Sequence, residues 1–236
     1  MSSISARRLL LVQVLITCCI TLHAQDREIV NESILWVQYS VKKNISEKYS
    51  GSFATQYRAF LDRESGYHLF FTLGVSRKLD YGFSLGAGFT NLNINREVDG
   101  GIVLVPEIRP YQQVAFTQSL GRSKFSWKFM VEQRFFKNAR DGELVRGFNN
   151  NWRFRNKAGY NQYLSDKWDL ILSSEIMFNA GNIGVNIFDQ HRAQLLLGYK
   201  GNSFGINMGY MHWFFQTASN RHENRHTLVM AFTHSI

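Results

Sequence analysis

The chain has 236 residues, of which 44% are hydrophobic, 19% are charged and 14% are aromatic, and its formal net charge is +9. This composition excludes a bundle of membrane helices, because each such helix needs roughly 20 consecutive apolar residues. It fits a soluble domain, and it fits equally well a membrane β-barrel, whose strands hide half of their residues from lipid. The chain has only 2 prolines, as expected where strands must donate a continuous ladder of hydrogen bonds.

The first residues, 1–24, are predicted to be a secretory signal peptide rather than part of the fold. Arg7 and Arg8 precede an apolar run that is too short for a comfortable membrane span, and Ala24 then offers a small residue for cleavage. We therefore expect a mature chain of residues 25–236.

Both cysteines of the chain, Cys18 and Cys19, lie in this segment. A lipoprotein signal is the competing interpretation, but Thr17 is a poor match to the small residue that such a signal needs. After cleavage the protein has no thiol, so we expect no disulfide and no cysteine-ligated metal. Loss of two arginines and no acids lowers the net charge by two, from +9 to +7. An exported protein would have little chance to meet cytoplasmic nucleic acid, so nucleic acid is not an expected partner.

From about residue 32 onward, the dominant pattern is alternation with period two, broken by turns. Very short turns alternate with longer polar connections. The short turns lie at 44–49, 79–82, 120–125, 164–168 and 199–204, and the longer connections lie near 62–66, 91–108, 137–148, 179–188 and 216–224. This alternation is typical of an outer-membrane barrel with short periplasmic turns and longer extracellular loops, whereas nothing enforces it in a sandwich.

An aromatic residue follows each short turn: Tyr49, Tyr81, Phe125, Trp168 and Phe204. Aromatic side chains favour the membrane interface, where the ring finds apolar contact and its polar edge finds water. Ordinary hairpin packing is the alternative explanation. Five aromatics at one offset favour an aromatic girdle where the strands would re-enter the bilayer.

The strands between the turns have one apolar face and one face of polar or very small residues. In the segment "NWRFRNKAGYNQYL", Trp152 and Phe154 share one face, and Arg153, Arg155 and Lys157 share the other. Basic residues interleaved with aromatics could instead form a nucleic-acid groove. Because the neighbouring segments repeat the same two-faced pattern, we interpret this one as a barrel strand with its charges in the lumen.

Four short motifs carry a resemblance to a known family: Glu132 with Arg134, Arg153 to Arg155, Glu175 and Arg192. They resemble an uncharacterised family of outer-membrane barrels that is common in the Bacteroidetes and known only as a domain of unknown function. The resemblance covers roughly residues 30–236. It implies a barrel fold and an outer-membrane location, and it brings no established activity. Many such barrels end on an aromatic residue, whereas this chain ends on Ile236.

The expected fold is all-β: a closed antiparallel transmembrane barrel over residues 25–236. Eleven segments are visible in the sequence, but single-chain bacterial barrels have even strand numbers. Residues 25–32 could add a short first strand before the segment 33–43, since they span about 26 Å at about 3.3 Å per residue. We therefore expect twelve strands, with ten as the alternative. The expected partners are outer-membrane lipids and the barrel assembly machinery, and the expected state is a monomer.

The sequence offers no convincing catalytic or metal constellation. His234 and Ser235 resemble a dyad, but neighbours on a strand point to opposite faces. His222 and His226 would lie about 13 Å apart in an extended segment. We expect no enzyme activity, no cofactor and no metal. The alternative is an outer-membrane lipid-modifying hydrolase, which would need a serine, a histidine and an acid on one face near the outer rim.

The luminal charges are the strongest candidate site. Pairing about the turns predicts Lys157 opposite Glu175, Glu175 opposite Arg192, and Glu132 close to Arg153. Buried charges are tolerable only when they are paired, so the prediction is an ion-pair network that fills a narrow lumen of a small transport or structural barrel. A selectivity region for a small anionic solute is the alternative, because cations outnumber acids there. The expected members are Glu132, Arg134, Arg153, Arg155, Lys157, Glu175 and Arg192.

Overall fold

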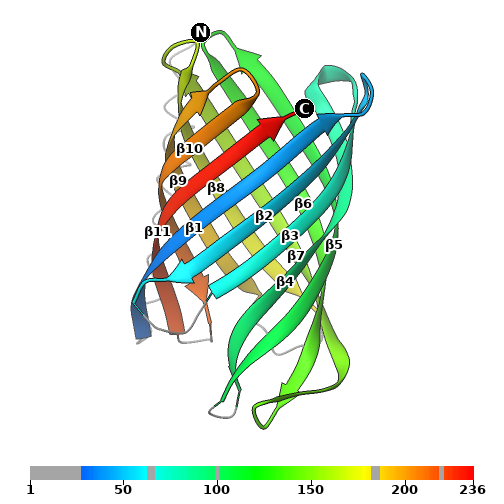
Figure 1. Cartoon of the computed structure of the whole chain (residues 1–236), viewed down its shortest axis with the longest axis vertical. Coiled ribbons are helices and arrows are strands. Elements are labelled where there is room, and N and C mark those ends of the chain that lie inside the picture. Colours follow the sequence, from blue (N-terminus) through cyan, green and yellow to red (C-terminus); the bar gives the residue numbers. More distant parts are fainter. Residues whose placement is uncertain (1–27, 63–66, 99–100, 182–186, 218–220) are drawn as a thin grey trace, which may run out of the picture.

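The structure, a computed structural model, describes residues 28–62, 67–98, 101–181, 187–217 and 221–236. These residues form a closed barrel of eleven strands (Figure 1), so the predicted all-β barrel is confirmed. The strands are β1 Glu28–Asn44, β2 Tyr49–Phe60, β3 Tyr67–Lys78, β4 Phe83–Val98, β5 Gly101–Leu120, β6 Ser123–Arg140, β7 Glu143–Tyr163, β8 Trp168–Ala180, β9 Phe188–Lys200, β10 Phe204–Gln216 and β11 Arg221–Ser235. A 3-10 turn, η1 Asp80–Gly82, precedes β4. The predicted signal peptide lies outside the described residues.

Each strand alternates between the lumen and the exterior, because successive side chains of a strand point to opposite faces. On β8, Leu172 and Phe178 are exposed on the outside, whereas Glu175 and Met177 are buried inside. The period-two pattern of the sequence therefore becomes two surfaces, an apolar exterior and an interior that holds the charged side chains together with a buried hydrophobic cluster around Trp36 and Trp213.

The exterior of the barrel is apolar on nearly every strand. Large hydrophobic side chains are exposed on ten of the eleven described strands, for example Tyr39, Phe53, Leu73, Leu85, Ile108, Trp152, Leu172, Leu195, Met208 and Leu228. Monomeric soluble proteins rarely expose apolar patches larger than a few hundred Å². None of the described residues forms a helix that is long and apolar enough to cross a membrane.

The barrel closes through a parallel pair, and this corrects the expected even strand count. β1 pairs with β11 in parallel register from Glu28 opposite Arg221 to Lys42 opposite Ser235, whereas the other neighbouring strands pair antiparallel. Figure 1 shows β1 and β11 side by side and running in the same direction. With the seam closed in this way, no twelfth strand is needed. The predicted first strand and the segment 33–43 are one strand, β1, and residues 25–27 lie outside the described residues.

Two of the predicted long loops are instead extensions of the sheet. The register of β4 and β5 continues without a break to Val98 opposite Gly101, and that of β6 and β7 continues to Arg140 opposite Glu143 after a shift at residue 138. Figure 1 shows these hairpins projecting beyond the other strands, at the end opposite the carboxyl terminus. The connections near 91–108 and 137–148 were therefore misjudged as loops, and in this region the inward side chains Val103, Val105 and Phe136 form a buried hydrophobic cluster.

The connections 45–48, 79–82, 121–122, 164–167 and 201–203 all lie at one end of the barrel, which we call the short-turn end. Four of the five predicted girdle aromatics, Tyr49, Tyr81, Trp168 and Phe204, are exposed there, and Phe125 is half-buried. The structure thus places all five at one end: Tyr49, Trp168 and Phe204 begin strands, Phe125 is the third residue of β6, and Tyr81 lies in the turn just before β4.

Glycines on β3 and β4 leave space that Tyr111 of β5 fills from across the sheet. A Cβ added to Gly74 would lie 2.3 Å from the Tyr111 hydroxyl, and one added to Gly88 would lie 2.6 Å from it. Tyr111 is itself buried. The Tyr111 ring therefore fills the space beside these small luminal residues, which is not left as an open channel.

Candidate functional site

The centre of the luminal charge network is Arg155, which lies between two carboxylates. Its Nη1 lies 2.8 Å from Oε1 of Glu132, and its Nη2 lies 2.7 Å from Oε1 of Glu175. Its Nε donates to the same Glu175 oxygen at 3.0 Å. Because β6, β7 and β8 are adjacent, each supplies one of these three side chains on its inner face. Charge-assisted contacts of this length are the strong ones in proteins.

The residues that lie opposite Glu175 across the strands are those expected from the turns, but the side chain in closest contact with it is a different one. Glu175 lies opposite both Lys157 and Arg192. Its contact with Arg192 is 3.7 Å, and the Lys157 Nζ instead lies 3.4 Å from Oε1 of Gln194. Arg155 is the principal partner of Glu175 because its long side chain reaches diagonally across the strand pair.

Glu132 lies opposite Arg153, as expected, at 3.9 Å between Oε2 and Nη1. Arg153 makes its closer contact with Asp189 of β9, at 3.0 Å. Asp189 also accepts from the side chains of Asn179 and Gln190. This buried acid was missed by the sequence interpretation, which assigned residues 179–188 to a loop and did not consider the strand start that follows it.

A second cluster joins Arg134 to two residues that sequence reasoning missed. Glu107 accepts from Arg109 at 2.7 Å and from Arg134 at 2.5 Å, and its side chain is completely buried. One carboxylate is therefore shared by two guanidinium groups. A third pair, Arg225 with Glu223, has a contact of 2.6 Å.

Two of the missed acids, Glu107 and Glu223, share a signal that the sequence contains. Glu107 with Arg109, Glu132 with Arg134 and Glu223 with Arg225 are three E-x-R motifs, and a spacing of two places both side chains on one face of a strand. Only the middle motif was assigned to the lumen, because the other two lie in segments that were taken for loops.

Arg58 of β2 lies in the lumen with aromatic rings around it. Its Cζ lies 3.4 Å from the Trp36 ring centroid and 4.0 Å from that of Phe70. Its Nη2 donates to Oε1 of Gln56 at 2.6 Å, and it makes no ion pair with any residue in the described ranges. Arg58 is only 8% exposed. A buried guanidinium held by ring faces and one amide is an unusual charge to leave without a carboxylate.

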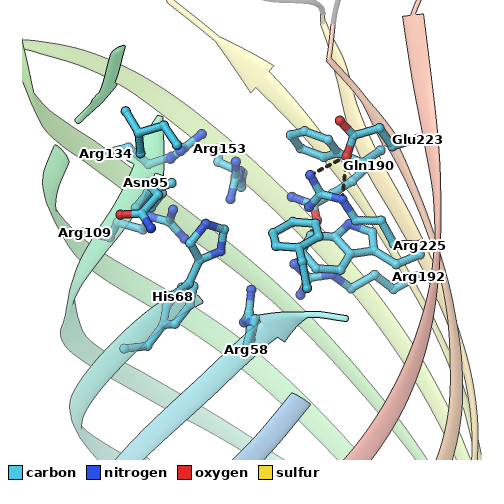
Figure 2. A pocket seen from close by; sticks show the side chains of 16 residues that line it. Arg58, His68, Asn95, Arg109, Arg134, Arg153, Gln190, Arg192, Glu223 and Arg225 are labelled. Carbon is cyan, nitrogen blue, oxygen red and sulfur yellow. Dashed lines mark hydrogen bonds and ion pairs between the residues drawn. The ribbon is translucent and has the colours of Figure 1, made fainter. Parts of the chain in front are cut away.

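Two cavities lie inside the barrel around these residues. The larger has a volume of about 370 Å³ and the smaller about 230 Å³, and Arg58, Arg109, Arg153 and Arg192 line both. Phe60, Ile102 and Phe215 line only the larger cavity, which therefore lies toward the end opposite the short turns. Figure 2 shows the labelled arginines surrounding the open centre of this cavity.

Within the described ranges, no group of three or more histidine, cysteine or acidic residues could hold a metal ion. His222 and His226 belong to β11 rather than to a loop, and His226 Nδ1 lies 2.7 Å from the Tyr210 hydroxyl. On the exterior, Ser174 Oγ lies 2.9 Å from Nε2 of His191. The sequence interpretation missed this pair because it did not assign faces to β9.

The fold and the site together define a class of protein, namely a closed β-barrel with an apolar exterior and a lumen of buried, largely paired charges. Within this class, the family model described as "Protein of unknown function (DUF2490)" matches residues 34–224, so the chain belongs to that family. The expected resemblance to a domain of unknown function is thereby confirmed. No curated protein is found to match the chain.

Proposed function

We propose that the protein is a bacterial outer-membrane β-barrel whose lumen is closed by its own ion pairs. In this proposal it is a small structural barrel, or one that holds a solute, rather than an open diffusion pore. Its partners are outer-membrane lipids and the barrel assembly machinery, and it is a monomer. The observation that carries the proposal is the contrast between an apolar exterior and a lumen whose charges are buried.

The exterior supports a membrane location. Exposed aromatic and aliphatic side chains cover ten strands, and the aromatics Tyr49, Tyr81, Trp168 and Phe204 gather at the short-turn end. Outer-membrane barrels have an outward apolar band bounded by aromatic girdles. The predicted signal peptide agrees with export.

The burial of the luminal charges supports a closed lumen. Glu132 is 2% exposed, and Glu175 and Arg153 are each 5% exposed. Met177 and Met211, which also point inward, are fully buried. In a water-filled channel these side chains would be solvated, so we expect little steady ion flow.

Fractionation and conductance measurements test the two parts separately. The mature chain should fractionate with outer membranes and should migrate differently on gels with and without heating. Purified protein in planar bilayers should show no steady conductance above that of the lipid alone. Recovery as a soluble periplasmic protein would refute the membrane location, and a stable ohmic conductance would refute the closed lumen.

The hydrogen bond between Ser174 and His191 favours one second candidate, a lipid-modifying hydrolase acting from the exterior of the barrel. Ser174 lies six residues from Trp168, about 20 Å along the strand at about 3.3 Å per residue. Its hydroxyl would attack an ester carbonyl while its proton passes to His191 Nε2 and then to the departing alcohol; water would then cleave the acyl-serine ester, releasing the carboxylic acid and restoring the hydroxyl. No carboxylate contacts His191 in the described part of the chain, so the pair lacks the third group that orients a histidine base.

Hydrolysis of phospholipid by the purified barrel in mixed micelles tests this candidate. Activity that Ser174→Ala abolishes and Ser173→Ala leaves intact would support it, because Ser173 lies on the luminal face of the same strand. Hydrolysis that is absent, or unchanged in Ser174→Ala, would exclude it.

A further inference from the structure

Six arginines line the larger cavity: Arg58, Arg109, Arg134, Arg153, Arg192 and Arg225. Each is at most 8% exposed, and among the residues that the structure describes only Glu223 adds a carboxylate to the cavity wall. Figure 2 shows these side chains entering from several strands around a common open space. The cavity therefore concentrates positive charge inside the barrel.

The neighbouring acids do not balance these cations. Asp189 pairs with Arg153 at 3.0 Å and Glu223 with Arg225 at 2.6 Å. Glu107, however, is shared between two arginines, and Glu175 is held by Arg155 at 2.7 Å while Arg192 remains 3.7 Å away. Arg58 makes no ion pair within the described chain. Because like charges in a low-dielectric site repel strongly, this arrangement favours an additional negative charge in the cavity.

Aromatic rings hold the guanidinium planes in position. The ring centroid of Trp213 lies 4.5 Å from Cζ of Arg192, 4.5 Å from Cζ of Arg225 and 5.6 Å from Cζ of Arg58. Trp36 and Trp213 lie next to each other, with centroids 6.1 Å apart. A guanidinium that stacks on a ring uses its face, and its N–H donors remain in the plane for other contacts.

Several of these donors have no acceptor. The Nε atoms of Arg58, Arg153 and Arg192 are buried and have no hydrogen-bond partner among the described residues. A buried donor without an acceptor costs free energy, more so when it is charged. These donors belong to three arginines that line one cavity, and a rotation of each side chain would bring its donor to a ligand there that accepts hydrogen bonds and carries negative charge.

We propose that the larger cavity is a binding site for a small phosphate-bearing solute, with Arg58, Arg153 and Arg192 as its principal ligands. Planar arginine forks match phosphate oxygens in a bidentate manner, and a phosphate offers both the charge and the several acceptors that the cavity lacks. A volume of about 370 Å³ also leaves room for a small organic group beside the phosphate. This inference goes beyond the closed barrel and does not depend on its membrane location.

Calorimetric titration of the refolded full-length barrel in detergent tests the site, with inorganic phosphate, glycerol phosphate and citrate as probes. Inorganic phosphate and glycerol phosphate should bind saturably at one site, more weakly at high salt, and should raise the thermal unfolding midpoint. Tighter binding of glycerol phosphate would identify a phosphate ester as the preferred source, and equal or tighter binding of inorganic phosphate would identify the free ion. Arg58→Gln should weaken phosphate binding by about 10- to 100-fold, as expected for loss of a charged hydrogen bond.

A matched control is Arg77→Gln, which removes the same charge from an exposed position on β3 and should leave phosphate binding unchanged. Without ligand, Arg58→Gln should keep or raise the unfolding midpoint, because it removes a buried cation that has no counter-charge. A merely structural Arg58 would give the reverse, a lower midpoint and unchanged binding.

Failure of both phosphate probes to bind the wild-type barrel would overturn the proposal, as would binding that Arg58→Gln leaves intact. Binding of citrate alone would replace phosphate by a polycarboxylate and would also overturn it. If Arg58→Gln does not refold, Arg192→Gln takes its place in the same comparison. The location and conductance of the barrel are measured separately, so a failure here is distinguishable from a failure of the proposed function.

Discussion

Replacement of Arg155 by glutamine should be among the most damaging single changes in the lumen. Arg155 contacts Glu132 at 2.8 Å and Glu175 at 2.7 Å, and the side chains of these acids are 3% and 6% exposed. The change leaves two buried carboxylates without their shared cation. Their remaining partners, Arg153 and Arg192, lie at 3.9 Å and 3.7 Å, beyond hydrogen-bond distance.

Breaking one partner of a buried ion pair typically costs about 3–5 kcal/mol. The Arg155 side chain is 18% exposed, so residual water lowers the cost somewhat, whereas the presence of two acids raises it. We therefore expect Arg155→Gln to lower the free energy of unfolding by about 3–5 kcal/mol. Lys157→Gln removes the same charge from the same face of the same strand. It should cost less than about 1 kcal/mol, because the Lys157 ammonium has only a 3.4 Å contact with Gln194.

Denaturant titration of the folded barrel in detergent measures both values. Adding Glu175→Gln to Arg155→Gln should recover part of the loss, and the coupling term of the double-mutant cycle should exceed about 1 kcal/mol. Strict additivity of the two changes would show that the residues do not interact. If Lys157→Gln had an equal effect, the loss of a positive charge near Glu175, rather than the loss of the observed Arg155 contact, would decide stability in the lumen.

Three further changes test the exterior, the packing and the seam. Leu172→Arg, on the exposed outer face of β8, should impair folding into lipid by about 2–4 kcal/mol; tolerance in lipid vesicles would contradict a membrane-facing exterior. Gly88→Ala should destabilise the barrel by about 1–3 kcal/mol in denaturant titration, because the new Cβ would lie 2.1 Å from the Leu73 carbonyl oxygen. The control is Gly51→Ala, whose new Cβ would meet nothing closer than 3.5 Å and which should be tolerated. Val37→Cys with Met230→Cys should form a disulfide under mild oxidation, seen as a gel shift, since the two are partners across the parallel seam; a twelfth strand between them would prevent it.

The sequence predicted the face of the luminal charges and the register of the central strands. The register between β7 and β8 follows from the four-residue turn 164–167, because a short turn leaves only one pairing that keeps the apolar residues outside. Glu175 therefore lies opposite Lys157, as expected.

The contacts within that register could not be predicted in the same way. Arg155 and Lys157 are both on the luminal face near Glu175, and side-chain reach rather than pairing decides which one contacts it. Glu107 and Glu223 were missed for a different reason. Glu107 follows the continuous apolar run 102–105, in which no alternation is visible, and Glu223 lies in a polar segment. Neither segment can be recognised as part of a two-faced strand until the neighbouring strand is known to extend as far.

The strand number could not be predicted because the rule of even numbers assumes that both ends of the chain lie on the same side. With an odd number of strands in an up-and-down barrel, the first and last strands run parallel, and the two ends of the chain lie at opposite ends of the barrel. β1 begins at Glu28 at the end opposite the short turns, and β11 ends at Ser235 at the short-turn end.

This topology has a consequence for the mature amino terminus in the proposed membrane. With cleavage after Ala24, only three residues precede Glu28, and they span at most about 11 Å, far less than the roughly 25 Å of an outer-membrane apolar band. A short epitope tag inserted before Gln25 should therefore be accessible to antibody on intact cells, whereas a tag in the turn 164–167 should become accessible only after permeabilisation. A twelve-strand barrel would place both tags in the periplasm. Protection of the amino-terminal tag on intact cells would contradict the parallel closure, and labelling of the turn tag would contradict the orientation.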